Sequence, residues 1–206
     1  MTTVMVIAKE PVAGRVKTRL TPPYTPEQAA ELAAAALADT LAAVAATPAE
    51  RKVLVLEGRP GAWLPPGIDV VPQGRGGLDA RLAAAFAGCE GPSLLIGMDT
   101  PQVTPELLRS ALEPGPDAWF GPASDGGFWA LGLAVPDPGL VRGVPMSTPC
   151  TGRTQRERLT AAGLTVRDLP ELRDVDTAQD AAWVAGQAPG TRFAAVLARC
   201  RTAAAR

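Results

Sequence analysis

The stretch that decides the fold runs from Thr3 to Leu20 and reads TVMVIAKEPVAGRVKTRL. Its first part, Val4–Ile7, is a compact apolar run, which is typical of a strand buried in a parallel sheet. A polar, basic loop follows at once. Thr25 and Pro26 then supply an N-cap and a first helical residue for a long helix. This order of strand, loop and helix favours an α/β fold.

The rest of the chain continues the alternation of apolar strands and helices. Further strands are predicted at Lys52–Leu56, Ile68–Val71, Leu94–Met98, Ala118–Phe120, Phe128–Val135 and Thr165–Leu169. Further helices are predicted at Leu78–Ala87, after the N-cap Thr104, and at Thr151–Ala162, Thr177–Ala185 and Thr191–Arg201. Such alternation favours a mostly parallel sheet with helices on its faces. No linker divides the chain, so residues 1–206 are expected to form a single domain.

Composition excludes several classes of protein. The chain has 206 residues, of which 47% are hydrophobic and 20% charged, and its formal net charge is -1. These values exclude a disordered chain and argue against a binder of nucleic acids or membrane surfaces. The sequence contains no histidine, which excludes a Ser-His-Asp triad, a Cys-His pair and a His-ligated zinc. Catalysis must therefore use carboxylates, Lys, Arg, hydroxyls, backbone amides or a bound metal.

Three features indicate a cytoplasmic protein. The apolar run Thr3–Ala8 is too short for a signal peptide and is followed directly by charged residues. The Ala-rich stretch Ala29–Ala46 carries Glu31 and Asp39, so it is expected to be an amphipathic helix of a soluble protein. The three cysteines lie far apart in the sequence, which is typical of free thiols in a reducing compartment.

The loop after the first strand is the strongest candidate for a phosphate site, because ligands of open α/β sheets bind beyond the carboxyl ends of the strands. It carries four cations, Lys9, Arg15, Lys17 and Arg19, within eleven residues. In an extended segment the alternating cations would share one side, where they could bind a di- or triphosphate. The alternative is a solvated basic loop. The residues assigned to nucleotide or phosphate binding are Ala8, Lys9, Gly14, Arg15, Lys17, Arg19 and, from a later turn, Gly76.

A carboxylate at the end of another predicted strand is the candidate metal ligand. Asp99 comes directly after the apolar run that ends at Met98, and Mg²⁺ is typically held by one or two carboxylates together with substrate phosphates. The alternative is an aspartate that stabilises a turn. Asp176 is a candidate second ligand, whereas Thr177 and Asp180 can cap the following helix. The predicted cofactor is Mg²⁺, or Mn²⁺, bound by Asp99 and Asp176.

Two glycine-rich turns also follow strands. Gln73–Arg81 reads QGRGGLDAR, and it is either a plain strand-to-helix turn or a contact to a base or ribose. Gly121–Trp129 reads GPASDGGFW, in which Asp-Gly-Gly is typical of a hairpin turn. The aromatic pair after it suggests a pocket wall, where Asp125 could hold an acceptor hydroxyl or act as a general base. The segment Val144–Pro149 is a further candidate border of an acceptor pocket.

These motifs together resemble the GT-A-like nucleotide-diphospho-sugar transferase superfamily. The resemblance rests on Ala8–Leu20, Gly97–Pro101, Gly121–Phe128 and Asp174–Asp180, which occur in this order over nearly the whole chain. Within the superfamily the sequence is most similar to the rSAM/selenodomain-associated transferases, also described as arsenosugar-biosynthesis glycosyltransferases. Phospholactate and molybdopterin guanylyltransferases share parts of the pattern. The resemblance implies a three-layer α/β/α domain of the GT-A (Rossmann-like) type with a mixed, mostly parallel sheet.

The resemblance also implies roles for individual residues. Arg15, Lys17 and Arg19 would contact phosphates, and Asp99 would bind a divalent metal that Asp176 helps to hold. Lys17, Asp99 and Asp125 are the residues expected to carry catalysis.

Three functions remain open from the sequence. The first is nucleotidyl transfer from an NTP to a small phosphorylated or acidic acceptor with release of pyrophosphate, which the strongly basic loop favours. The second is glycosyl transfer from a nucleotide-diphospho-sugar to a small-molecule acceptor. The third is a nucleotide-binding module without turnover. No nucleic acid or membrane partner is expected, and the oligomeric state stays open, with a homodimer as one option.

Overall fold

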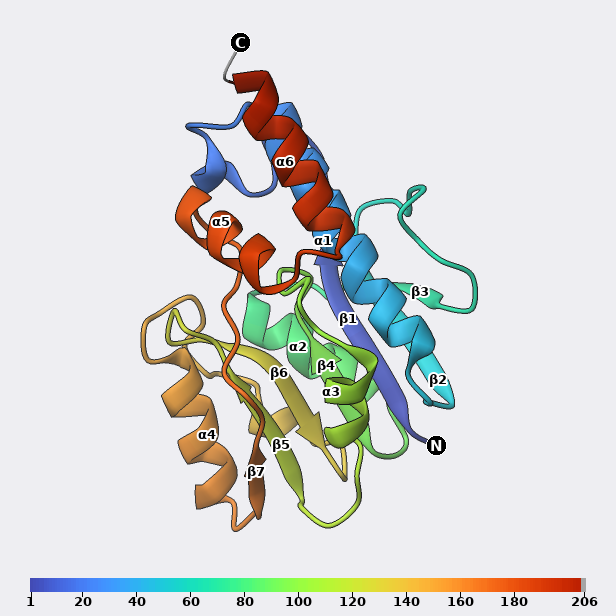
Figure 1. Cartoon of the computed structure of the whole chain (residues 1–206). Coiled ribbons are helices and arrows are strands. Elements are labelled where there is room, and N and C mark those ends of the chain that lie inside the picture. The colour runs from blue at the N-terminus through green and yellow to red at the C-terminus, as the bar shows by residue number, and fades with distance from the viewer. Residues whose placement is uncertain (205–206) are drawn as a thin grey trace.

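A seven-stranded sheet forms the middle of the molecule, and the computed structural model describes residues 1–204 around it (Figure 1). The strands lie in the order β3-β2-β1-β4-β6-β5-β7. Their bounds are β1 Thr3–Lys9, β2 Arg51–Glu57, β3 Asp69–Pro72, β4 Ser93–Ile96, β5 Ala118–Pro122, β6 Phe128–Leu133 and β7 Val166–Asp168. Every predicted strand is present, which confirms the α/β class.

The sheet is mostly parallel, as the sequence predicts. Only β6 runs against its neighbours, β4 and β5, whereas the other pairs are parallel. The chain passes from β1 to β2 on one side of β1 and returns to β4 on its other side. The carboxyl ends of β1 and β4 therefore flank a switch in strand order, which is where ligands of such sheets bind.

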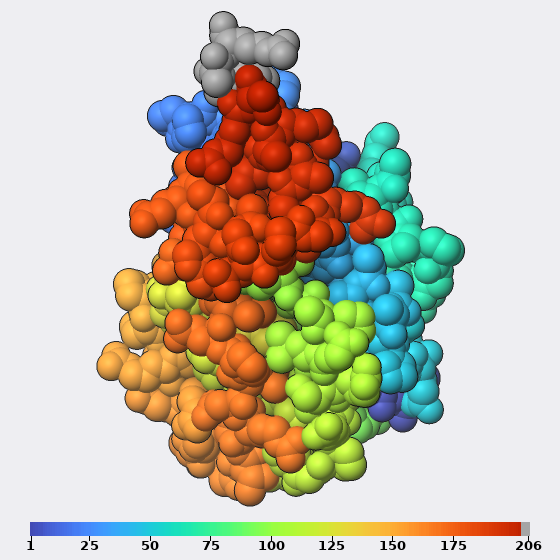
Figure 2. Space-filling model, viewed as in Figure 1, coloured from blue at the N-terminus to red at the C-terminus, as the bar shows by residue number. Residues whose placement is uncertain are grey.

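Helices cover both faces of the sheet, which confirms the three-layer architecture. Their bounds are α1 Pro26–Ala46, α2 Leu78–Ala87, α3 Pro105–Ser110, α4 Thr151–Ala161, α5 Ala178–Gln187 and α6 Arg192–Ala204. One core joins α1 and α3 to the first face, and a second joins α2 and α4 to the opposite face. A third core joins α5 and α6 to the outer side of α1. In the space-filling view these two C-terminal helices form the outer surface of that region (Figure 2).

Helix α1 is a core helix, not the amphipathic helix that its charged residues suggested. A capping box between Thr25 and Gln28 starts it. Small Ala side chains then let it pack closely against the sheet on one side and against α6 on the other. It is long and apolar enough to cross a membrane, but 61% of its most apolar window is buried inside the protein. A helix that is apolar on nearly all sides fits this position between two packed layers.

The main departures from the predicted elements are short. Two single-turn 3₁₀ helices, η1 Thr18–Leu20 and η2 Pro138–Leu140, lie in segments expected to be loops. Strands β4 and β6 each end two residues before their predicted ends. The basic loop is also not extended, because Lys17 adopts a left-handed backbone conformation with φ 48° and η1 follows it. The argument that alternation alone puts the three cations on one side is therefore wrong.

Candidate active site

A cavity of about 480 Å³ opens at the carboxyl ends of β1 and β4. Most of the predicted site residues line it, namely Ala8, Lys9, Arg15, Lys17, Arg19, Asp99, Asp125 and Asp176. Gly14 and Gly76 are not among the lining residues. Both have positive φ values, 75° and 100°, so they shape the turns that carry their neighbours.

Lys17 is brought into the cavity by its backbone and not by strand-like alternation. Its left-handed conformation turns the side chain inward, and only 10% of that side chain is exposed. The ammonium Nζ lies 2.7 Å from Oδ2 of Asp99 and 2.9 Å from Oδ1 of Asp176. Arg19 is 78% exposed and reaches Oδ2 of Asp176 at 3.2 Å. The predicted phosphate ligand Lys17 thus bridges the two predicted metal ligands.

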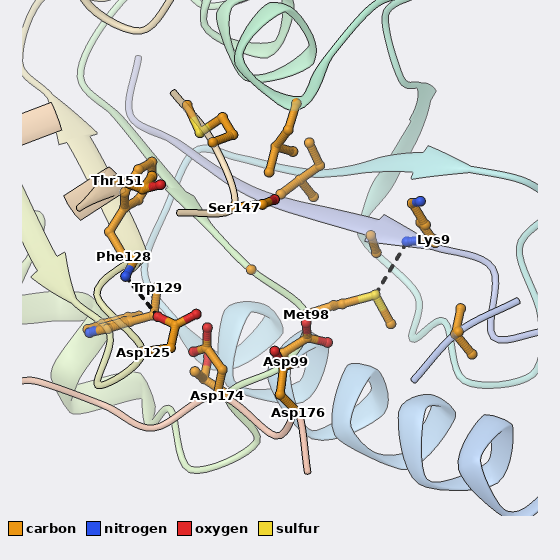
Figure 3. Close-up of a pocket in the computed structure, with 18 of the residues that line it drawn as sticks. Lys9, Met98, Asp99, Asp125, Phe128, Trp129, Ser147, Thr151, Asp174 and Asp176 are labelled. Carbon is orange, nitrogen blue, oxygen red and sulfur yellow. Dashed lines mark hydrogen bonds between the residues drawn. The ribbon is translucent and has the colours of Figure 1, made fainter. Parts of the chain in front are cut away.

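The acidic residues converge because one backbone hydrogen bond joins two distant segments. The Val175 amide donates to the carbonyl of Asp99 at 3.0 Å, which ties the end of β4 to the segment before α5. Val175 is buried in the core of α1, α5 and α6. Alternation along this extended segment puts Asp174 and Asp176, on either side of Val175, into the cavity. Figure 3 shows both carboxylates beside Asp99 along one side of the cavity.

The charges in this cluster shift one another's protonation. Burial alone would lower the pKa of Lys17, but the carboxylates of Asp99 and Asp176 outweigh it and raise that pKa. Burial would likewise raise the pKa of Asp176, but Lys17 and Arg19 outweigh it and lower that pKa. Lys17 also acts on Asp174, but burial and the nearby carboxylates Asp99 and Asp125 outweigh it and raise the pKa of Asp174 to about 7.

The donor set fits a hard divalent cation that also binds phosphate. All the candidate ligands are carboxylate oxygens, which Mg²⁺ and Mn²⁺ accept. Oδ1 of Asp99 and Oδ1 of Asp174 are buried without a hydrogen-bond partner among the described residues. Within residues 1–204, however, no three acidic or thiol side chains are close enough to form a complete metal site. A cation here would take its remaining ligands from the substrate.

Another part of the cavity wall contains the predicted acceptor residues. Oδ1 of Asp125 accepts a hydrogen bond from the Gly127 amide at 2.8 Å and so closes the predicted turn. Beyond it the wall is formed by Phe128, Trp129, Met146, Ser147, Thr148 and Thr151. We call these six residues the acceptor wall. The prediction that the aromatic pair and the segment Val144–Pro149 border the pocket is confirmed.

The Asp125 turn is held by close packing against the start of α4. The Gly152 amide donates to the carbonyl of Gly126 at 2.8 Å. A Cβ on Gly152 would collide with the carbonyls of Gly126 and Gly127. Glycine at position 152 therefore allows the close approach that positions Asp125 in the cavity.

Gly152→Ala is expected to lower the free energy of unfolding by about 1–3 kcal/mol, because the added methyl group forces the two backbones apart. Thermal unfolding measures the change. Gly186→Ala is the matched control: this glycine lies within α5, and a Cβ there would meet no atom within 4 Å. The control should raise stability by about 0.5–1 kcal/mol. Equal effects in both variants would show that the contact with the turn is not tight.

The turn Gln73–Arg81 is linked to the cavity by side chains and not by its glycines. The Gln73 side-chain amide donates to the Ala8 carbonyl at 2.7 Å, and its oxygen accepts from Arg81. Arg81 also pairs with Glu57 at 2.7 Å. Asp79, in the first turn of α2, accepts a hydrogen bond from the Gly143 amide at 2.9 Å and so joins α2 to the segment after η2. A base or ribose contact of this turn stays a prediction.

Sequence reasoning missed Asp174 as a site residue. The segment Asp174–Asp180 contributed to the family resemblance, but only Asp176 was considered as a metal ligand. The signal was the alternation itself, since one buried Val between two acidic residues points both carboxylates the same way. Ser147 and Thr148 fall in the segment predicted to border the pocket, whereas Thr151, at the start of α4, carried no local signal that it faces the cavity.

Three solved structures are similar to this chain in fold. A crystal structure from Desulfovibrio desulfuricans G20, which carries the provisional name nucleotide-diphospho-sugar transferase, is 28% identical, with a TM-score of 0.79 over 87% of this chain and 84% of that one. Rv0371c from Mycobacterium tuberculosis H37Rv, solved with manganese, is 23% identical, with a TM-score of 0.54 over 89% and 96%. A CMP:2-keto-3-deoxy-manno-octonic acid synthetase solved with CTP is 10% identical, with a TM-score of 0.57 over 92% and 98%.

The likeness to the Desulfovibrio structure supports the GT-A-like superfamily, the other two structures show the fold alone, and the narrower rSAM-associated family stays a prediction. The chain is an enzyme of the transferase class, built on the fold of nucleotide-using transferases. A comparison with curated proteins finds no match. A family model described as "Uncharacterized protein conserved in bacteria (DUF2064)" matches residues 28–148, which is more than half of the chain. The chain therefore belongs to the DUF2064 family.

Proposed function

We propose that this chain is a divalent-cation-dependent nucleotidyltransferase, which transfers the nucleotidyl group of an NTP to a small acceptor. The observation that carries the proposal is that Arg15, Lys17 and Arg19 line the same cavity as the carboxylates at the end of β4 and before α5. A leaving pyrophosphate needs concentrated positive charge, and a chain without histidine can supply it in this way.

In this reaction the acceptor oxygen attacks the α-phosphorus, and the bond between the α-phosphorus and its bridging oxygen to the β-phosphorus breaks. Arg15 and Arg19, which are exposed at the mouth, would bind the leaving phosphates. Asp99 and Asp176 would hold a cation that neutralises phosphate charge. If the acceptor is a hydroxyl, Asp125 is placed to take its proton. Most of the rate enhancement would then come from positioning and electrostatics.

A second function, glycosyl transfer from a nucleotide-diphospho-sugar, is favoured by the charge of the acceptor wall. That wall carries the hydroxyls of Ser147, Thr148 and Thr151 beside Asp125, and none of its six residues is a cation. The cationic residues that line the cavity come from the N-terminal segment and from α2. An acceptor with hydroxyl groups fits this wall better than the phosphorylated or acidic acceptor expected from the sequence. The name of the Desulfovibrio relative supports the same alternative.

Calorimetry with a nucleotide panel tests the proposal. The panel contains the NTPs and the UDP-, GDP- and dTDP-sugars, each with and without Mg²⁺. Nucleotidyl transfer predicts that one NTP binds with Mg²⁺ at least tenfold more tightly than its own nucleotide sugar. A preference for the nucleotide sugar would make this a glycosyltransferase. If every nucleotide binds equally tightly with and without Mg²⁺, the cation-dependent reaction is contradicted for both nucleotidyl and glycosyl transfer.

A further inference from the structure

The Lys17 ammonium lies where a cation between Asp99 and Asp176 would lie. Its distances to the two carboxylates are 2.7 and 2.9 Å, and it approaches one oxygen of each. The predicted metal ligands therefore already share a positive charge that belongs to the chain. A metal bound between Asp99 and Asp176 would have to take the place of the ammonium, so both cations cannot lie there together.

Two features show that this position of Lys17 is held and is not a chance contact of a mobile side chain. Its side chain is among the least exposed of the cationic side chains that form ion pairs, at 10% against 78% for Arg19. Its backbone has φ 48°, a left-handed conformation that is unfavourable for a non-glycine residue and persists only where the surroundings impose it. The η1 turn that follows Lys17 contributes Leu20 to a buried core and so anchors the segment.

The charge of the cluster explains why an internal cation is needed. Asp99, Asp174 and Asp176 all line the cavity, and without Lys17 their carboxylates would face one another with only the exposed Arg19 nearby. Like charges at such separations repel strongly in a partly buried site. A lysine in their midst stabilises the free protein, but it also competes with any divalent cation.

We propose that Lys17 is a built-in counter-cation that keeps the divalent cation out until nucleotide phosphates arrive. In the free protein its ammonium neutralises Asp99 and Asp176. When a cation and phosphates bind together, the ammonium leaves the two carboxylates and pairs with the phosphates instead. Cation and phosphates then bind with positive coupling, because each makes the displacement of Lys17 easier for the other. The inference rests on the proposed function for the identity of the ligands.

The first test measures Mn²⁺ binding, from the free-Mn²⁺ electron paramagnetic resonance signal, with and without inorganic pyrophosphate. Wild-type protein should bind Mn²⁺ weakly alone and about tenfold or more tightly with pyrophosphate, a typical size for coupled sites. Lys17→Met keeps an unbranched side chain as far as Cε and removes the ammonium, so it should bind Mn²⁺ alone about tenfold more tightly than wild type. The matched control is Lys52→Met, since Lys52 does not line the cavity, and it should bind Mn²⁺ alone as wild type does.

If Lys17 binds only phosphate, Lys17→Met should bind Mn²⁺ without pyrophosphate as tightly as wild type does. If Lys17 is purely structural, the variant should bind Mn²⁺ more weakly than wild type. Either result for Lys17→Met overturns the inference. If metal-dependent nucleotide binding is nevertheless seen in the calorimetric panel, the proposed function survives without it. If Lys17→Met gains Mn²⁺ affinity but no nucleotide binds with metal, the proposed function fails and the counter-cation role stands.

A second test uses the wild-type protein, in case the variant does not fold. The sequence contains three lysines, Lys9, Lys17 and Lys52, so ¹⁵N-lysine labelling gives a simple ammonium spectrum. The Lys17 signal, protected by its two carboxylates, should persist when Mg²⁺ is added alone at low concentration. It should shift when Mg²⁺ and pyrophosphate are added together. A Lys17 signal that stays unchanged while calorimetry shows both ligands bound would overturn the proposal.

Discussion

Asp99→Asn is expected to lower transferase activity by about 10²-fold or more, the usual cost of removing a group that stabilises charge in the transition state. Asp99 holds its place by backbone structure, because its carbonyl is bound by the Val175 amide at 3.0 Å. The variant should therefore keep the fold while losing one carboxylate charge of the cation site. Steady-state kinetics over a range of Mg²⁺ concentrations measures the effect, with thermal unfolding as the check on folding.

Asp125→Asn is the matched comparison within the same cavity. Asp125 lies near the acceptor wall and Asp99 at the end of β4, so the two variants should separate two roles. Asp125→Asn should lower kcat without changing the Mg²⁺ dependence, whereas Asp99→Asn should also raise the Mg²⁺ concentration needed. Activity of Asp99→Asn near the wild-type level would exclude this residue as a metal ligand.

The strands and the position of the site could be predicted because both depend on local pattern. The apolar run of β1, the helix start at Thr25 and the carboxylate after β4 each follow from a few adjacent residues. Once the sheet was expected to be mostly parallel, the carboxyl ends of its strands had to meet at one edge. This is why residues as far apart as Lys17 and Asp176 could be assigned to one cavity before their contact was seen.

What the sequence could not show depends on long-range packing. The Ala-rich α1 carries Glu31 and Asp39, which suggested an exposed face, but α5 and α6 cover much of its outer side. No local pattern says where two C-terminal helices will dock. The direction of Lys17 was hidden for a different reason, since a left-handed lysine has no signature in composition or spacing.

Asp174→Asn is expected to stabilise the metal-free protein at neutral and alkaline pH. Burial and the neighbouring carboxylates raise the pKa of Asp174 to about 7, above its ordinary value of 3.8. The folded protein therefore binds this proton more tightly than the unfolded chain does, and wild-type stability falls as pH rises from about 4 through 7. Asparagine resembles the protonated acid and never ionises, so the variant avoids this loss.

The gain should be close to zero at pH 4 and should reach roughly 2–4 kcal/mol above pH 7, as thermal or urea unfolding across this range would measure. For a chain of this length that corresponds to a rise in Tm of roughly 5–10 °C. Asp69→Asn is the control, because Asp69 has a 71% exposed side chain and should give no gain that grows with pH. Mg²⁺ added together with pyrophosphate should narrow the difference between Asp174→Asn and wild type, since a bound cation compensates the charge that the variant removes. A gain in stability that is the same at pH 4 and pH 8 would show that asparagine acts through packing and that the pKa of Asp174 is not raised in the folded protein.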